Sequence, residues 1–237
     1  MFLQNSPALG EQALNKIATV ALQSQFKQAK TFHVEVKTDS NLLAQGRLEA
    51  LSIEGSGLIL PNNLPVQEMK IKMGRISVSP FKALMGNIQL TEPSHGTARF
   101  GLTDAEVNRA FHSHLAAQIR SATDADLKTT KPQQVNCYMF ARGEIIVNLQ
   151  FKGQHLAIAT QPEMAQTGNY IALENSRYLQ GSEPTPALTH AIAQSLEAAL
   201  NVQQFELPGL SLRLRQFQIE DGKIILQATA KMTQFPK

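Results

Sequence analysis

Residues 6–26 carry a helical pattern of apolar positions. Apolar residues recur every three or four positions on one face of this segment, at Leu9, Ala13, Ile17 and Val20. Ser6 is a suitable N-cap and Pro7 follows it at the first helical position, so a long N-terminal helix is expected over residues 6–26. Further apolar residues widen this face beyond the need of a surface helix, at Leu14, Ala18, Ala21 and Leu22. Two interpretations stay open, which are a core helix of an α+β domain and a helix that keeps apolar surface for a ligand.

Alternating apolar and polar residues predict a series of β-strands downstream. The expected strands cover residues 32–36, 66–79, 87–90, 96–102, 135–140, 144–151, 154–160, 170–178, 209–220 and 223–232. A β-hairpin is expected over residues 46–60, with its turn at Glu54-Gly55-Ser56-Gly57. In the strand 66–79, one face carries Met69, Ile71 and Met73, and the other carries Glu68, Lys70 and Lys72.

Two further helices are expected. Thr103 and Glu106 have the spacing of a capping box, which predicts a helix with an inner face of Val107, Ala110, Phe111, Leu115 and Ile119. Pro184 and Pro186 introduce a third helix over residues 187–200. Residues 39–41 are interpreted as a turn, 81–85 as a short helix and 121–132 as a polar loop. Because helices stand apart from runs of hairpin-connected strands, the sequence predicts an α+β fold with a mostly antiparallel sheet.

Residues 48–60 are similar to residues 214–226. In both segments the apolar alternation slips by one position, which predicts β-bulges near Glu49-Ala50 and near Arg215-Gln216. The similarity has two explanations, either two unrelated hairpins or an internal duplication of a helix plus a hairpin. In both cases the chain is expected to form a single domain over residues 1–237.

The charge balance permits an anionic partner without requiring one. The chain has 22 Lys and Arg against 19 Asp and Glu, a net charge of +3. A nucleic-acid partner is not expected, because basic residues form no run and the aromatic residues are few and scattered. Cys137 is the single cysteine, which excludes an internal disulfide, and its alternation with Val135 and Met139 predicts that it points into the core.

No apolar run approaches the roughly 18 residues that a transmembrane span needs. Phe2-Leu3 is too short for the apolar region of a signal peptide. The chain as written is therefore expected to be cytoplasmic or peripheral to a membrane. A leader removed beforehand would instead make the protein a resident of the cell envelope or periplasm.

Catalytic motifs are not evident in the sequence. His112 and His114 point in different directions on a helix and cannot share a metal ion. The chain has no Gly-x-Ser-x-Gly motif, no phosphate-binding glycine loop and no zinc-binding His-Glu pair, so neither a cofactor nor an enzymatic activity is expected. A hydrolase with a dispersed site stays a weaker alternative, which a cluster of Ser, His and Asp in a cleft would revive.

Basic residues lie on strand faces opposite apolar rows. Lys70 and Lys72 share one strand face, and Arg213 and Arg215 share another. These residues suit an ordinary solvated face, and they equally suit headgroup contact at an anionic membrane. The methionines suit a pliable apolar lining as well as an ordinary core.

Several segments resemble a known family. They are residues 10–16 (GEQALNK), 42–48 (LLAQGRL), 52–58 (SIEGSGL), 80–93 (PFKALMGNIQLTEP), 102–111 (LTDAEVNRAF), 201–207 (NVQQFEL) and 210–214 (LSLRL). Together they resemble the LmeA-like phospholipid-binding family over nearly the whole chain. The resemblance implies a relation to tubular lipid-binding domains, in which a strongly curved antiparallel sheet wraps a long helix and leaves an apolar channel for acyl chains.

The expected function is non-catalytic binding of a phospholipid or another acyl-chain lipid, as a carrier or sensor at a membrane surface. The candidate lining residues are Ile17, Val20, Ala21, Met69, Ile71, Met73 and Phe111. The alternative is a membrane-associated scaffold or assembly factor with a filled core and no ligand. Lipid identity and oligomeric state do not follow from the sequence.

Overall fold

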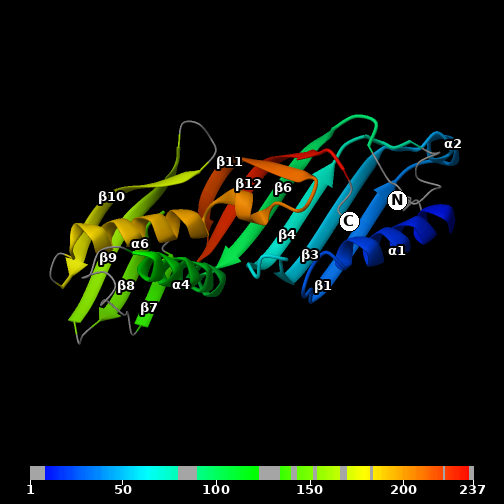
Figure 1. The fold of residues 1–237 in the computed structure, drawn as a ribbon. Helices are drawn as coiled ribbons and strands as arrows, with labels where there is room; N and C mark the ends of the chain where they lie inside the picture. Colours follow the sequence, from blue (N-terminus) through cyan, green and yellow to red (C-terminus); the bar gives the residue numbers. More distant parts are fainter. Residues whose placement is uncertain are drawn as a thin grey trace, which may run out of the picture. The chain divides into compact units, whose positions relative to one another are not determined.

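A computed structural model describes residues 9–79, 90–122, 134–139, 143–151, 154–165, 170–181, 184–220 and 222–234. The helices are α1 (Leu9–Gln23), α2 (Ser40–Ala44), α4 (Asp104–Ser121) and α6 (Pro186–Ala199), with a 3-10 turn η1 (Val202–Phe205). The strands are β1 (Thr31–Lys37), β2 (Arg47–Leu48), β3 (Ala50–Ile59), β4 (Pro65–Met73), β5 (Ile76–Ser77), β6 (Ser94–Thr103), β7 (Gln134–Met139), β8 (Ile145–Phe151), β9 (Gln154–Met164), β10 (Ile171–Gln180), β11 (Leu210–Glu220) and β12 (Lys223–Met232). The expected α+β class with a mostly antiparallel sheet is confirmed (Figure 1).

The described strands form three open sheets. The largest has the order β1-β3-β4-β6-β12-β11, the second has the order β10-β9-β8-β7, and β2 pairs with β5. Consecutive strands β7, β8, β9 and β10 are neighbours, as short connections favour. Each sheet has two edge strands, so none of them is closed.

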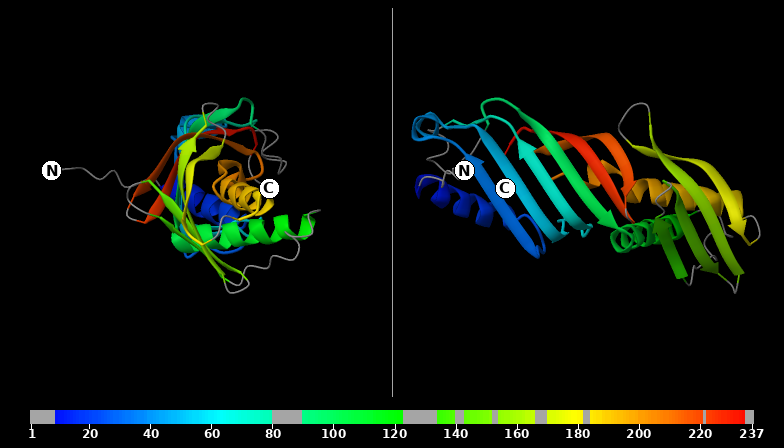
Figure 2. Two further views of the ribbon diagram at one scale, coloured as in Figure 1. Left: turned by 90° about the vertical axis from the view of Figure 1, so that its left-hand side faces the viewer. Right: turned by 180° about the vertical axis from the view of Figure 1, so that it is seen from behind.

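The chain divides into two compact units. The first comprises Met1–Phe100, Gln203–Arg213 and Gln227–Lys237, and the second comprises Gly101–Val202 and Leu214–Leu226. In the first unit, α1 runs alongside β1 (Figure 1). In the second unit, α4 and α6 lie together on one face of the four-stranded sheet (Figures 1 and 2).

The second and third expected helices are confirmed. Thr103 is the N-cap of α4, and its backbone N–H donates to the Glu106 carboxylate at 2.8 Å, as the capping box predicted. The expected inner face of α4 is buried. Thr185 caps α6 by accepting a hydrogen bond from the Leu188 N–H at 3.3 Å, and Pro186 occupies its first turn.

The prediction of a long N-terminal helix is wrong. Helix α1 has 15 residues and ends at Gln23, whereas α4 has 18. Beyond Gln23 the chain forms two hydrogen bonds between residues three apart, from Gln25 N–H to Leu22 O and from Phe26 N–H to Gln23 O. The Lys27 N–H then donates to Ile59 O at 2.9 Å, so the backbone leaves the helix to pair with β3.

The predicted hairpin turn at Glu54-Gly55-Ser56-Gly57 is also wrong, because β3 runs straight through it. Pairs on both sides keep one register, from Thr31↔Ser56 on β1 to Ser56↔Glu68 on β4. At Gly57, φ is +56°, and a Cβ would lie 2.9 Å from Lys30 Cβ. Glycine is therefore needed here for close approach of the segment after α1, and not for a turn.

The expected bulge at Glu49-Ala50 is a strand break without an extra residue. Leu48 pairs with Ile76 and Leu51 pairs with Met73, so two residues separate the pairs on each strand. In β11, Arg215 and Gln216 are both exposed, as the slipped alternation predicts, and the bulge there stays a prediction. Because 48–60 includes a continuous strand and 214–226 spans the β11–β12 connection, the two similar segments do not share a hairpin.

One helix was missed, and several expectations lie outside the described residues. The Asp39 carboxylate accepts a hydrogen bond from Leu42 N–H at 2.8 Å, which makes α2 a helix where a turn was expected. Outside the description fall the Ser6 cap with Pro7, the short helix at 81–85, most of the strand at 87–90 and most of the loop at 121–132.

Candidate functional site

An apolar face extends across β1, β3 and β4 in the first unit. Opposed residues of antiparallel strands share a face, so the strand register groups them into rows. One row joins Val34, Ile53 and Ile71, and the next joins Val36, Leu51 and Met73. All six side chains are at most 4% exposed. The predicted apolar row of Met69, Ile71 and Met73 on β4 is thus part of a three-stranded apolar surface.

A third row carries a glycine at its centre. Phe32, Gly55 and Met69 oppose each other on the three strands. A Cβ at Gly55 would lie 3.0 Å from the Leu58 side chain and 3.2 Å from the Phe32 ring. The absent side chain leaves room for these two, and the Phe32 ring also packs on Phe26, with centroids 5.1 Å apart.

Helix α1 meets the sheet through polar side chains at the β1 edge. Val34 N–H donates to Thr19 Oγ1 at 3.2 Å, and Val36 N–H donates to Asn15 Oδ1 at 2.7 Å. Four helical residues rise about 6 Å and two strand residues about 6.6 Å, so acceptors four apart match donors two apart. Because β1 is an edge strand, these two bonds satisfy N–H groups that the sheet leaves unpaired.

Two of the three candidate residues on α1, Val20 and Ala21, are exposed to solvent. Asn15, Thr19 and Leu22 share one helical face, and Leu22 is 6% exposed. Val20 lies about 100° from Thr19 around the helix and is 66% exposed. Ala21 is also exposed. The side chain of Ile17 falls outside the described part of the structure, so its role stays a prediction.

Phe111 lies in the other unit from the remaining candidates. It is fully buried on the inner face of α4, in residues 101–202. The structure therefore brings Met69, Ile71 and Met73 together and places Phe111 in the other unit.

The second unit has a similar helix–strand joint, in which side-chain acceptors of α4 bind backbone N–H groups of the edge strand β7. Met139 N–H donates to Asp104 Oδ1 at 3.2 Å, and Cys137 N–H donates to Asn108 Oδ1. Asn108 Nδ2 in turn donates to Cys137 O at 3.0 Å. These polar acceptors were not predicted in either unit, although polar pairs four residues apart at the boundary of an apolar helix face are a signal for them.

Two ionisable groups at this joint have raised pKa values. Burial, with a contribution from the Asp104 charge, raises the pKa of the Cys137 thiol to about 12. Burial also raises the pKa of Asp104, and the Met139 hydrogen bond opposes that shift. Cys137 points into the core as expected, and it stays protonated at neutral pH, so it is not a thiolate nucleophile.

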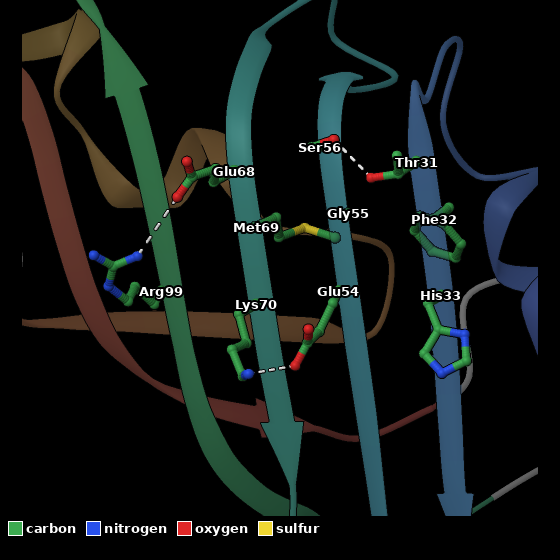
Figure 3. A pocket seen from close by; sticks show the side chains of 10 residues that line it. All are labelled: Thr31, Phe32, His33, Glu54, Gly55, Ser56, Glu68, Met69, Lys70 and Arg99. Carbon is green, nitrogen blue, oxygen red and sulfur yellow. Dashed lines mark hydrogen bonds and ion pairs between the residues drawn. The ribbon is translucent and has the colours of Figure 1, made fainter.

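The opposite face of β1, β3 and β4 carries charged and polar side chains. A shallow groove of about 400 Å³ there is also lined by Phe32, Gly55 and Met69 of the third row (Figure 3). Glu54 forms an ion pair with Lys70, and Glu68 lies 3.9 Å from Arg99. The hydrogen bond from Lys70 lowers the pKa of Glu54. Because the charges pair across neighbouring strands, this groove does not concentrate positive charge. Lys70 and Lys72 share this face as predicted.

A second groove, of about 700 Å³, lies between α6 and β10. Its lining residues are Tyr178, Pro184, Pro186, Thr189, His190 and Ala193. The Tyr178 hydroxyl lies 3.3 Å from Thr189 Oγ1. This lining holds one histidine without a carboxylate or a serine, so it does not supply the cluster that would favour a hydrolase. Within the described residues, no group of three His, Cys, Asp or Glu could hold a metal ion.

Comparison with family models shows which protein family the chain belongs to. The family described as LmeA-like phospholipid-binding matches residues 8–229. The chain belongs to this family. The match covers parts of both compact units and confirms the resemblance seen in the sequence, with phospholipid as the ligand that the family name specifies. Searches of curated proteins and of solved structures gave no match. None of the described helices has the length and apolar character to span a bilayer.

Proposed function

We propose that residues 1–237 act as one domain that binds a phospholipid or another acyl-chain lipid without catalysis, as a carrier or sensor at a membrane surface. Acyl chains would lie in an apolar channel between α1 and the face formed by β1, β3 and β4. The observation that carries this proposal is that a three-stranded apolar face is covered at its edge by a helix held through polar contacts. Met69, Ile71 and Met73 would line the sheet side.

Breaking the two polar contacts between α1 and β1 requires little free energy compared with lipid burial. The face is closed in this structure, since Val34 and Ile71 are 0% exposed. Moving the N-terminal part of α1 away from β1 breaks the bonds of Asn15 and Thr19, each with a net value of about 1 kcal/mol. Each buried CH₂ contributes about 0.8 kcal/mol, so about three methylene groups offset this loss.

The residues around the channel suit such an opening. Leu22 and Phe26 anchor the C-terminal end of α1, and Gln28 bridges to Ile59. The helix could therefore pivot about this end while β1 keeps its place. Met69 and Met73 flank Ile71, and methionine adapts its shape to irregular apolar surfaces.

Native purification followed by organic extraction and mass spectrometry tests the proposal. We expect stoichiometric phospholipid, and uptake from vesicles by lipid-free protein. A phospholipid with a diazirine on its acyl chain should label α1, β1, β3 or β4. Labelling confined to the second unit, or no lipid by either route, would overturn the proposal.

A matched pair of variants separates lipid contact from stability. Ile71 on β4 and Ile145 on β8 are both fully buried, one in each unit. Threonine at either position adds an unpaired hydroxyl, and similar losses of stability are expected. Only I71T should lower lipid affinity, by about tenfold, which is the effect of burying a hydroxyl against an acyl chain.

The filled-core scaffold is a second candidate, which the complete burial of the apolar rows favours. It predicts no bound lipid and equal behaviour of I71T and I145T. The extraction experiment therefore decides between the two.

A further inference from the structure

Helix α1 contacts the β1 edge through Asn15 and Thr19, and residues on another side of the helix face solvent. Asn15 and Thr19 bind the β1 edge, and Leu22 is buried on the same side. Val20 is 66% exposed, more than any other large apolar residue of the described chain, and Ala21 beside it is exposed as well.

The exposed apolar residues of α1 are accompanied by lysines. Lys16 lies one helical turn before Val20 on the same surface and is exposed. Lys27 and Lys30 are exposed as well. Both follow the C-terminal end of α1, which is the end that carries Val20. From Leu9 to Lys37 the net charge is +2, from Lys16, Lys27, Lys30, Lys37, Glu11 and Glu35.

We propose that α1 docks the protein on an anionic phospholipid bilayer, with Val20 and Ala21 inserted at the headgroup boundary and Lys16, Lys27 and Lys30 on the lipid phosphates. The choice of a bilayer rests on the proposed function, whereas the docking surface follows from the exposure of Val20 and Ala21 and from the nearby lysine charges. Apolar residues beside lysines are the pattern of helices that lie in a membrane interface. Lysine also suits this position because its aliphatic stem covers apolar surface while its ammonium group stays at the headgroups.

Docking through this face is compatible with the contacts of the helix. Val20 and Ala21 are not on the side that binds β1, so insertion leaves the bonds of Asn15 and Thr19 intact. The Lys27 ammonium donates to Asn63 Oδ1 at 2.6 Å, which holds this charge beside the end of the helix. The same helix would then be both the membrane contact and the cover of the proposed channel.

Vesicle flotation tests the docking surface. The probes are vesicles of phosphatidylcholine and vesicles in which phosphatidylglycerol replaces part of it. The unmodified protein should bind the anionic vesicles more tightly, and added salt should weaken this binding. V20D should lower the affinity at least about tenfold, since burying a valine side chain is worth about 1.5–3 kcal/mol. K16Q should lower it about fivefold, and only on anionic vesicles.

A matched control lies on the second unit. Leu179 in β10 is 48% exposed and is not near α1 in the chain, so L179D should leave vesicle binding unchanged. Unfolding curves of V20D should match those of the unmodified protein, because the residue is mostly in water already. Unchanged binding by V20D, or equal loss with L179D, would overturn the proposal.

The test also separates docking from its rivals. A V20D variant that changes the oligomeric state without affecting flotation would assign the face to a second copy of the chain and overturn membrane docking. V20D that retains extractable lipid but fails to float supports docking and leaves the proposed channel standing. Flotation by a protein that neither co-purifies with lipid nor takes it up from vesicles refutes the channel alone.

Discussion

In the first unit α1 meets the edge strand β1 through Asn15 and Thr19, and in the second unit α4 meets the edge strand β7 through Asp104 and Asn108. Both joints place acceptors four residues apart on a helix against N–H groups two residues apart on a strand. In both, the chain direction of the helix is opposite to that of the strand, because the earlier helix residue binds the later strand residue. A repeated solution of this kind protects two sheet edges by one geometric rule.

The joints differ in strength and in what surrounds them. Asn108 binds both the N–H and the C=O of Cys137, and a carboxylate occupies the other position. Helix α6 also packs against α4. Among the described residues, Thr19 and Asn15 each accept a single bond from β1, and Val20 on another side of α1 is 66% exposed. The comparison shows that the same helix–strand geometry is supported by more polar contacts at β7 than at β1.

The largest effect is expected from N108L in the second unit. It leaves both the N–H and the C=O of Cys137 without this partner, at about 1–3 kcal/mol for each buried group. Urea unfolding should therefore show a loss of about 2–6 kcal/mol. N136A, on the exposed side of β7, should change stability by less than about 0.5 kcal/mol. Equal stability of N108L and the unmodified protein would refute a strong joint.

The double variant N15A/T19V should have a smaller effect. Its two bonds have a net value of about 1 kcal/mol each, and water can reach the freed groups at an opened sheet edge, so a loss of about 1–2 kcal/mol is expected. Lipid uptake from vesicles should become faster. A loss as large as that of N108L, with unchanged uptake, would remove the distinction between the two joints.

The pH dependence of the second joint gives a sharper test. Burial raises the pKa of Asp104, so the folded state favours the protonated carboxyl. Its contribution to stability is present below the ordinary Asp pKa and is lost as pH rises through the raised value. D104N keeps an acceptor for Met139 N–H and should remove this dependence in melting temperatures measured across that range. Parallel pH profiles of the two proteins would contradict the assignment.

The smallest effect is expected on the polar face of the first unit. Glu54 and Lys70 are about half exposed, so E54Q should change stability by less than about 1 kcal/mol in urea unfolding. Lys70 lowers the pKa of Glu54, so the contribution of the pair is present above the ordinary Glu pKa and is lost as pH falls through the lowered value. A larger effect at neutral pH would mean that this face carries more than solvated pairs.

Local patterns were sufficient for much of the fold. The capping box of Thr103 and Glu106 and the alternation along β4 depend on neighbours within a few residues, and both were predicted correctly. The turn expected at Gly55 and Gly57 was wrong, because these glycines instead leave room for Phe32 and Lys30. Phe32 comes from another strand, and Lys30 comes from the segment after α1. A glycine has the same local signature in a turn and under a close neighbour.

The sequence by itself determined the fold class, the apolar rows of the strands and the family. These follow from periodicity and from residues that are close in the chain. Only the tertiary structure decided that α1 binds the β1 edge through Asn15 and Thr19, that Val20 is exposed, and that Phe111 belongs to another unit than Ile71. The physical reason is that periodicity predicts which helix face is apolar, but it does not predict which surface that face contacts. The position of α1 depends on backbone N–H groups that a strand distant in sequence leaves unpaired.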